Sequence, residues 1–372
     1  MDHIPVSSPS IEAEDIRAVT ETMRAGWISS EGPQVQEFEQ KFAALVGRRH
    51  GVAVANGTAA IDIALETLNL GPGDEVILPS FTIISCLGHV LRSGATPVFV
   101  DAEPDSWNME ASVVEGLITS NTKAIIVVHI YGLPADIDHI VAVANKRGIP
   151  VIEDAAEAHG QQLNQRPLGS FGDISTFSFY SNKLVTTGEG GMVLTNDDAL
   201  AEKFRELRNL SFNPTQRFVH ENLGWNYRMT AMQAALGVSQ LSRIEELLEN
   251  KRAIGRTYQE LLTRTDGLTL PLESHRGSSN AYWVFGVVLS EDHHLTAKQA
   301  MDELRRLGIG TRPFFYPLHR QPVLARYGFQ SQAPLPTSEW LGDKGFYLPN
   351  GAGLSRAQQV RVVEGLDAVL AS

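Results

Sequence analysis

The sequence predicts an α/β protein in which a mostly parallel, mixed sheet lies between helices, followed by a smaller C-terminal α+β domain. Three observations lead to this fold class. Short apolar runs of strand length alternate with helical periodicity over the first half of the chain. Turns such as Gly71-Pro72-Gly73-Asp74 separate these runs. After Arg228 the alternation gives way to longer helical segments, which indicates a second domain.

Helices are expected where apolar residues recur every three or four positions. In residues 11–25 these are Ile16, Val19 and Met23, with Ser10 as a candidate N-cap. The same criterion predicts helices over residues 35–46, 58–70, 82–92 and 137–146. Strands are predicted over residues 51–55, 75–78, 97–100, 124–129, 151–152, 174–180 and 192–194. Helices that link such strands are typical of parallel sheets.

The C-terminal part is predicted to open with one long helix over residues 229–261. A strand over 283–289 and helices over 296–307 and 355–370 follow, with a proline-rich stretch at 313–322. We place the domain boundary near Glu246. This divides the chain into a large domain, residues 1–246, and a small domain, residues 247–372.

The composition excludes several classes of function. A formal net charge of -12 argues against nucleic-acid binding through a basic surface. Cys86 is the single cysteine, which excludes an internal disulfide, and no spacing of His, Cys, Asp or Glu suggests a metal site. The N-terminus does not read as a signal peptide, and the apolar runs are too short to span a membrane. We therefore expect a cytoplasmic, enzyme-sized protein without a membrane partner.

Lys183 is the most informative residue of the chain. It follows the predicted strand 174–180 and precedes a glycine turn, Gly188-Glu189-Gly190-Gly191, and a second apolar run. Burial between two strands lowers the pKa of a lysine, so that its neutral amine can attack a carbonyl and form a Schiff base. Taken alone, a solvated loop lysine beside a hairpin is the better interpretation, because most lysines are exposed.

Two further segments suit the same chemistry. Asn56-Gly57-Thr58 lies between a predicted strand and a predicted helix, where backbone N–H groups favour an anion. The alternative is an ordinary Asn-Gly turn with Thr58 as the helix cap. Glu153-Asp154 ends a predicted strand, at the edge where open α/β sheets bind ligands. There Asp154 could keep a ring nitrogen protonated, or could serve only as a helix cap or a solvated strand end.

The three elements together are more specific than each one alone. In chain order they supply an anion cradle, a carboxylate for a ring nitrogen and an amine for an aldehyde. Pyridoxal phosphate (PLP) needs these three partners for its phosphate, its pyridine nitrogen and its aldehyde. The combination predicts a PLP-dependent enzyme with Lys183 and Asp154 as catalytic residues.

Seven long segments carry a family resemblance: GWISSEGPQVQEFEQKF (26–42), ANGTAAIDIAL (55–65), GPGDEVILPSFT (71–82), GATPVFVD (94–101), VIEDAAEAHG (151–160), GDISTFSFYSNKLVTTGEGGMVLTND (172–197) and GWNYRMTAMQAALG (224–237). On these segments the chain resembles the DegT/DnrJ-type sugar aminotransferases over essentially its full length. The resemblance implies the aspartate-aminotransferase-like fold (PLP fold type I), PLP as cofactor and a homodimer. Within the family the chain resembles GDP-perosamine synthases, which aminate carbon 4 of a nucleotide-linked 4-keto-6-deoxy sugar.

The resemblance also implies roles for individual residues near the cofactor ring. Lys183 matches the lysine that binds the cofactor aldehyde, and Asp154 matches the partner of the pyridine nitrogen. Glu157 matches a position near the ring that is often glutamine or histidine in relatives. Ile83 matches a position where many relatives carry an aromatic residue that stacks on the ring. An isoleucine covers a ring by dispersion alone, so we expect weaker retention of the cofactor.

Other residues match the phosphate site. Gly57, Thr58 and Ser178 correspond to the phosphate cradle. Asn226 corresponds to a residue that reaches the phosphate bound by the neighbouring subunit, and packing of Trp225 and Tyr227 at a domain corner is the alternative role of this segment. The resemblance therefore implies a homodimer with shared active sites and an inactive monomer.

The remaining candidates concern the substrate. The turn TTGEGG, residues 186–191, resembles the version in relatives that aminate carbon 4, although it could simply close a hairpin. His319 resembles a residue near the substrate mouth, and Trp27, Ser29 and Ser30 are candidates for lining the sugar-nucleotide pocket. His159 is a further candidate, but a lone histidine is more often structural than catalytic.

Together these observations predict amino transfer from L-glutamate to carbon 4 of a nucleotide-linked 4-keto-6-deoxy sugar. Such products serve lipopolysaccharide O-antigen, other glycans or natural products. The alternatives are an aminotransferase for another keto sugar or a cyclitol ketone, and a non-catalytic regulatory or sensor protein of the same fold. A PLP-dependent sugar dehydratase is disfavoured, because those relatives replace the lysine with histidine.

Overall fold

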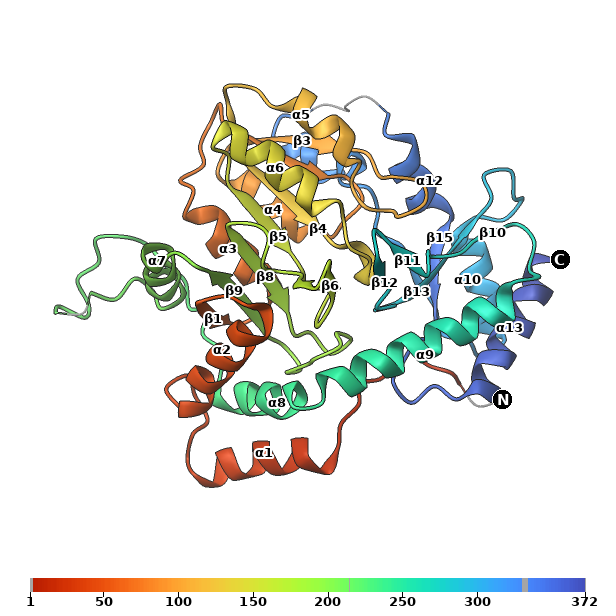
Figure 1. The fold of residues 1–372 in the computed structure, drawn as a ribbon, viewed down its shortest axis with the longest axis horizontal. Helices are drawn as coiled ribbons and strands as arrows, with labels where there is room; N and C mark the ends of the chain where they lie inside the picture. Colours follow the sequence, from red (N-terminus) through yellow and green to blue (C-terminus); the bar gives the residue numbers. More distant parts are fainter. Residues whose placement is uncertain (1–2, 214, 330–333, 372) are drawn as a thin grey trace.

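Seven strands form the central sheet in a computed structural model that describes residues 3–213, 215–329 and 334–371. Their spatial order among the described residues is β1-β9-β8-β5-β4-β2-β3 (Figure 1). The strands are β1 (His50–Val54), β2 (Glu75–Pro79), β3 (Thr96–Val100), β4 (Thr122–Val128), β5 (Val151–Asp154), β8 (Ile174–Ser178) and β9 (Gly191–Thr195).

The sheet is mostly parallel, as predicted. The pairs β2–β3, β2–β4, β4–β5 and β5–β8 are parallel, whereas β9 pairs antiparallel with both β8 and β1. Since the segment between β8 and β9 contains no crossover helix, β9 returns beside β8 in the opposite direction. The carboxyl ends of β4, β5 and β8 meet at one edge, which is where ligands bind in such sheets.

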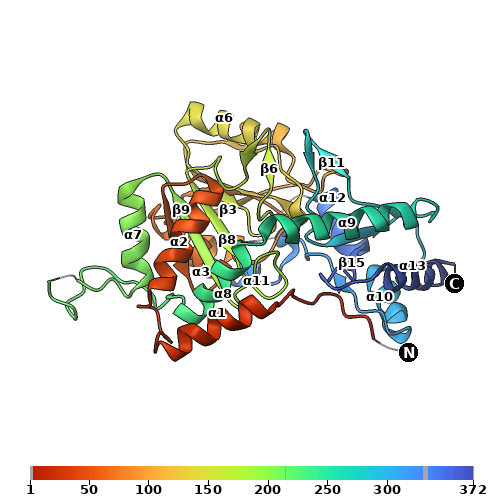
Figure 2. The ribbon, with the colours of Figure 1, turned by 60° about the horizontal axis from the view of Figure 1, so that its bottom comes forward.

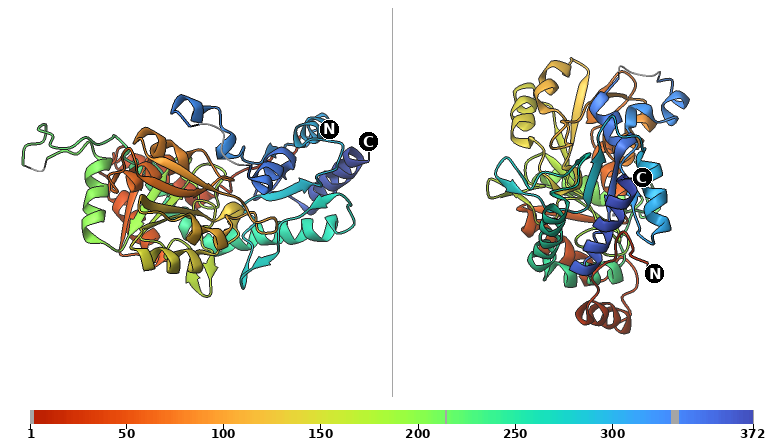
Figure 3. Two further views of the ribbon diagram at one scale, coloured as in Figure 1. Left: turned by 90° about the horizontal axis from the view of Figure 1, so that it is seen from above. Right: turned by 90° about the vertical axis from the view of Figure 1, so that its right-hand side faces the viewer.

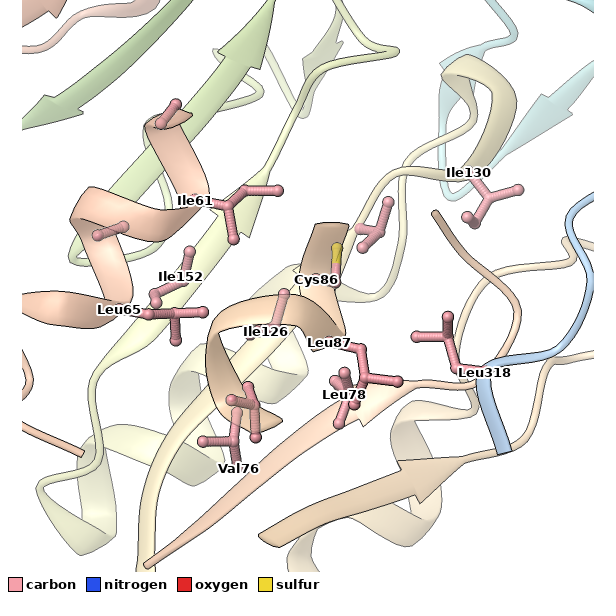
Figure 4. Close-up of a cluster of buried hydrophobic side chains, with 14 of the residues drawn as sticks. Ile61, Leu65, Val76, Leu78, Cys86, Leu87, Ile126, Ile130, Ile152 and Leu318 are labelled. Atoms are coloured by element: carbon pink, nitrogen blue, oxygen red, sulfur yellow. The ribbon is translucent and has the colours of Figure 1, made fainter. Parts of the chain in front are cut away.

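Two layers of helices cover the sheet. One face packs against α3 (Gly57–Glu66), α4 (Ser85–Arg92) and α7 (Asp198–Arg208), and the other against α2 (Pro33–Val46), α6 (Ile137–Arg147) and α8 (Ala231–Leu241). Successive strand residues divide between the two layers because their side chains alternate in direction: Ile152 belongs to the first layer and Val151 to the second. Figure 4 shows the first layer, where Leu65 and Leu87 lie near Ile152 and Leu78.

A second sheet of four strands belongs to the C-terminal part, in the order β10-β13-β15-β14. Its apolar residues share a core with α9, α10 and α13, and the two chain ends lie beside it (Figure 2). Ile4 joins this core and pairs with Ile309, so the N-terminal segment runs along the C-terminal unit. The strands are β10 (Leu268–Thr269), β13 (Phe285–Leu289), β14 (Arg312–Pro313) and β15 (Gly345–Leu348), and the helices are α9 (Ile244–Leu262), α10 (Ala297–Arg306), α11 (Val323–Arg326), α12 (Pro336–Lys344) and α13 (Arg356–Leu370).

Short elements complete the description. Two small ribbons pair β6 (Gln162–Leu163) with β7 (Arg166–Pro167) and β11 (Ser274–His275) with β12 (Ser278–Ser279). The remaining helical segments are α1 (Ala13–Arg24), α5 (Val114–Leu117), η1 (Ala111–Val113), η2 (Ile130–Gly132) and η3 (Leu318–Arg320). None of the helices in the described part of the chain combines the length and apolar character needed to cross a membrane.

Two local expectations were wrong. The single helix predicted over residues 229–261 is two helices, α8 and α9, which are separated at Ser242 and Arg243. The N-cap of α1 is Glu12 rather than Ser10, and it forms a capping box with Asp15. The domain boundary near Glu246 falls in the first turn of α9, which runs from the large unit into the small one (Figure 1), and it stays a prediction.

Candidate active site

Lys183 lies in the loop after β8, with a side chain that is only 10% exposed. Its Nζ is 3.7 Å from Oε1 of Glu157 and 3.6 Å from the centroid of the Trp283 ring. Burial lowers the pKa of Lys183, and the negative charges of Glu157 and Asp154 partly offset this effect. A buried amine with a depressed pKa is the form that attacks a carbonyl.

Glu157 is the nearest carboxylate to this amine. Its Oε2 accepts a hydrogen bond of 2.8 Å from the backbone N–H of Tyr131. Burial raises the pKa of Glu157 to about 7, although the charge of Lys183 acts to lower it. Close to neutral pH, Glu157 can therefore hold or release a proton beside the lysine.

Asp154 is the last residue of β5 and is buried. One carboxylate oxygen accepts a hydrogen bond of 3.1 Å from the N–H of Ala156, and the other lies 3.6 Å from the Cys86 thiol, which donates to it. Burial raises the pKa of Asp154, whereas the N–H of Ala156 and the charge of Lys183 lower it. The carboxylate thus faces the same space as the lysine, at the carboxyl end of a parallel strand.

The neighbouring Glu153 points to the opposite side of β5 and has a structural role. Its carboxylate accepts hydrogen bonds from His129 at 3.0 Å and from the backbone N–H groups of Phe171 and Gly172 at 2.8 and 3.0 Å. Burial raises the pKa of Glu153, but the bond and charge of His129, together with the backbone N–H groups of Gly169 and Gly172, outweigh burial and bring the pKa below its ordinary value. Strand alternation therefore leaves Asp154 as the carboxylate of this pair that faces Lys183.

The N-terminus of α3 forms the predicted anion cradle. Asn56 is the helix cap, since its side chain accepts a hydrogen bond of 2.9 Å from Ala59, so Thr58 is not needed as a cap. Thr58 Oγ1 lies 2.8 Å from Ser85 Oγ. A Cβ at Gly57 would come within 2.7 Å of the Ser178 Cβ, so the strand and helix approach this closely only with glycine. The hydroxyl of Ser178 and the first N–H groups of α3 thus lie together.

Ile83 and Asn226 are exposed, and neither is joined to Lys183 by a described contact. Ile83 precedes α4 and is 40% exposed. Asn226 is at the surface beside the end of β1, where the N–H of Ala55 donates to Tyr227 O at 2.7 Å. The rings of Trp225 and Tyr227 stack at 5.4 Å with an interplanar angle of 3°. The two side chains pack over α3 and α4, where the Trp225 ring lies 6.5 Å from the His89 ring and the Tyr227 hydroxyl donates a hydrogen bond of 3.2 Å to Asp62. The contact of Asn226 with a second subunit stays a prediction.

The candidate substrate residues Trp27, Ser29 and Ser30 precede α2, and no described contact joins them to Lys183. Trp27 is 42% exposed, and the carbonyl of Ser29 accepts a hydrogen bond of 2.7 Å from Ala231 at the start of α8. Ser30 lines a surface cavity of about 660 Å³ together with Arg48 and Arg208. Contact of these three residues with a substrate stays a prediction.

The two candidate histidines are both buried. His319 Nδ1 is 2.6 Å from Ser80 Oγ, and its Nε2 is 3.0 Å from Glu339, so both ring nitrogens have protein partners. His159 Nδ1 accepts from the N–H of Val185 at 3.2 Å, and burial lowers the pKa of His159 to about 3. Both are held as structural residues in this structure, which gives no support to a substrate contact by His319.

Comparison with known proteins places this geometry in a family. The model of the DegT/DnrJ/EryC1/StrS aminotransferase family matches residues 9–367. The chain belongs to this family. It is 42% identical over 371 residues to the GDP-perosamine synthase of Caulobacter vibrioides and 37% identical over 369 residues to that of Escherichia coli O157:H7, covering 98% or more of each chain. The aminotransferase TlmJ from Streptoalloteichus hindustanus has a similar structure, with a TM-score of 0.91 and 30% identity over 99% of both chains.

DegT/DnrJ/EryC1/StrS aminotransferases use PLP, and the residues of this member fit the cofactor. The closeness of Gly57 to Ser178 leaves the backbone N–H groups of α3 open to a phosphate. Asp154 supplies a buried carboxylate for the pyridine nitrogen, and Lys183 supplies a buried amine for the aldehyde. The enzyme is therefore a PLP-dependent sugar aminotransferase, as the sequence predicted.

Three residues of this aminotransferase contact the site but were not predicted from the sequence. Trp283 covers the lysine from the C-terminal part, Cys86 contacts Asp154, and Tyr131 bonds to Glu157. Tyr131 has a φ of 55°, a strained value for a residue other than glycine and one that is common at functional sites. No local pattern marks these residues, because each meets its partner only through the fold.

Proposed function

We propose that this enzyme moves the amino group of L-glutamate to carbon 4 of a nucleotide-linked 4-keto-6-deoxy sugar, in the manner of a GDP-perosamine synthase. The observation that carries the proposal is the group of Lys183, Glu157 and Asp154 at the carboxyl edge of the sheet. The similarity to GDP-perosamine synthases over the whole chain supports the choice of substrate. The product would serve O-antigen or another glycan.

Each residue of the site has a distinct task in this reaction. Bound PLP supplies an aldehyde that accepts an amino group and a ring that accepts electrons from the bond broken at the amino acid. Lys183 would bind the aldehyde and, once released, carry a proton to and from the reacting carbon. Asp154 would hold a proton at the pyridine nitrogen, and the N-terminus of α3 with Ser178 would bind the phosphate.

Glu157 would control whether the amine of Lys183 carries a proton. Its carboxylate pairs with the ammonium form of the lysine at 3.7 Å, and its pKa of about 7 lets it accept a proton when the lysine must be neutral. The peptide N–H of Tyr131 fixes the carboxylate in position at 2.8 Å. The pair thus holds a mobile proton next to the reacting atoms.

The test uses the purified protein, PLP and two substrates in sequence. L-Glutamate should remove the visible absorbance band of the bound cofactor and release 2-oxoglutarate. A GDP-linked 4-keto-6-deoxy sugar should then restore the band and yield a 4-amino sugar by mass spectrometry and NMR. Restoration by a cyclitol ketone alone would favour that alternative, and a band that ignores amino donors would favour a non-catalytic regulatory protein.

Two wider expectations belong to this proposal. A homodimer with shared active sites is supported by the exposed position of Asn226 and by the family, whose members would donate this residue to the partner. A cytoplasmic location stays a prediction from the sequence, and it fits the buried free thiol of Cys86.

A further inference from the structure

Trp283 contacts the amine of Lys183 although the two residues are 100 positions apart in the chain. The Nζ atom lies over the indole ring, 3.6 Å from its centroid. Such a distance is typical of a cation–π interaction, and indole is the most effective of the aromatic side chains in this role. Trp283 is 7% exposed, so water does not weaken the contact.

The indole is fixed in this position from two sides. Its Nε1 donates a hydrogen bond of 2.9 Å to the carbonyl of Asn182, the residue before the lysine. The carbonyl of Trp283 accepts a hydrogen bond of 3.2 Å from Nζ of Lys251 on α9, and Lys251 also donates to the carbonyl of Asn350. The ring is thereby tied to the lysine loop, and the backbone that carries the ring is tied to α9.

Lys251 is an unusual anchor. It is buried, and no carboxylate of the described residues forms an ion pair with it. Burial lowers the pKa of Lys251 to about 7. A buried lysine that bonds only to carbonyls costs stability, which is tolerable where the backbone it holds must stay in place.

We propose that Trp283 is a further catalytic residue of this enzyme, whose ring face positions the amine of Lys183 and stabilises it in the charged form. Lys251 acts as a positioning residue, because it holds the backbone of Trp283. The inference rests on the proposed role of Lys183, but it concerns the charge of the amine and not the choice of substrate.

The groups around Lys183 explain why an aromatic ring is useful there. The titratable neighbours are Glu157 at 3.7 Å, Asp154 and the buried His159, whose pKa is lowered by burial and by the charge of Lys183. Glu157 loses its negative charge when it is protonated close to neutral pH. The indole cannot be protonated, so its contribution to the ammonium persists across that pH range.

The test compares Trp283→Phe with Trp340→Phe in protein freed of the cofactor. Trp340 is a matched control, since its Nε1 also donates to a backbone carbonyl, Leu289 O, at 3.0 Å. The labelling of Lys183 by an amine-reactive reagent is followed by mass spectrometry as a function of pH. Phenylalanine still covers Lys183 with an aromatic ring but attracts a cation less strongly. The pH midpoint of Lys183 labelling should therefore fall by about half a pH unit in Trp283→Phe and stay unchanged in Trp340→Phe.

A second measurement uses the protein loaded with PLP, in which the pH titration of the visible band should move in the same direction. Lys251→Met should give a smaller shift, because the indole remains but its backbone is less well held. Circular dichroism shows that each variant is folded. An unchanged or raised labelling midpoint in folded Trp283→Phe would overturn the inference. No substrate enters the experiment, so that failure is distinct from failure of the proposed function.

Discussion

Lys183 is the residue on which the chemistry depends. Replacing it with alanine removes the amine that binds the cofactor aldehyde and moves the proton, so we expect turnover to fall by at least about a thousandfold. The measurement is 2-oxoglutarate release from L-glutamate. Lys203→Ala is the control, since Lys203 pairs with Glu206 on α7 and should be replaceable without loss. Full activity of Lys183→Ala would refute the assignment.

The raised pKa of Glu157 should be detectable in the pH dependence of the free energy of unfolding. Its pKa is about 7 in the folded protein against an ordinary 4.5, so between these values the folded state binds more protons than the unfolded state. Stability associated with this group is present at low pH and is lost as pH rises toward 7. Glu157→Gln should therefore gain up to about 3 kcal/mol relative to the native protein between pH 5 and 8.

Chemical denaturation of Glu157→Gln and of the native protein at about pH 5 and about pH 8 measures this difference in the free energy of unfolding. The exposed Glu202 provides a control, and Glu202→Gln should show the same pH trend as the native protein. A constant difference between Glu157→Gln and the native protein at both pH values would contradict a raised pKa at Glu157.

Single residues also show what a sequence can and cannot reveal. Lys183, Asp154 and Gly57 could be predicted as a set, because each lies at or just after the end of a strand and together they supply the three partners that PLP needs. Trp283 could not, because its contact with Lys183 depends on how the C-terminal unit packs. Both ring nitrogens of His319 have partners in Ser80 and Glu339, which no local pattern foretold, and its contact with the substrate stays a prediction.

At the scale of elements, the start of α3 depends on a close approach to β8. A methyl group on Gly57 would lie 2.7 Å from the Ser178 Cβ, so helix and strand would have to separate. Gly57→Ala should weaken PLP binding by about tenfold through this overpacking. Gly116→Ala on α5 is the control, since a Cβ there meets no atom within 4 Å. Equal dissociation constants for the two variants would place the phosphate elsewhere.

At the break between α8 and α9, contacts with a distant part of the chain outweigh the helical periodicity of the sequence. The sequence SQLSRIEELL contains no proline or glycine and predicts a continuous helix. The structure breaks it because Asp15 of α1, buried at 1% exposure, binds Ser239, Gln240 and Arg243 at 2.6–2.8 Å. Helix existence was therefore predictable from the sequence, whereas the break depends on a residue more than 220 positions away.

This junction should be important for stability. Asp15→Ala leaves Arg243 without its partner in a largely buried site, and we expect a loss of about 3 kcal/mol in the free energy of unfolding. Urea denaturation measures it. Glu14→Ala is the matched control, because Glu14 forms only an exposed pair with Arg17 and should change stability by less than about 0.5 kcal/mol. A comparable loss in both variants would show that α1 itself, rather than the junction, is affected.

For the whole molecule, the apolar surface points to a second copy of the chain. The arm between α7 and α8 extends away from the body (Figures 2 and 3) and carries Phe218 and Leu223, which are 79% and 88% exposed. Met23 and Trp27, at the end of α1 and just after it, are also exposed. Large exposed apolar side chains of this kind mark interaction sites. The arm and α1 therefore support the proposed homodimer.

Shared active sites can be tested by mixing two inactive variants. Lys183→Ala lacks the reactive amine, and Asn226→Ala lacks the residue proposed to reach the partner's phosphate site. If Asn226 reaches the partner's site, the Lys183→Ala subunit of a mixed dimer receives the Asn226→Ala substitution in its own site. The other site then contains a native lysine and a native asparagine and is intact. Random exchange makes half of all dimers mixed, so activity should recover to about a quarter of the native value.

The exchange is performed by mild unfolding and refolding of the two variants together, with different affinity tags to isolate the mixed dimer. Each variant refolded alone is the control and should stay inactive or strongly impaired. Recovery of activity in the isolated mixed dimer would establish that Asn226 acts across the interface. Isolated mixed dimers without activity would mean that Asn226 serves the site of its own subunit, because both sites of the mixed dimer would then carry a defect.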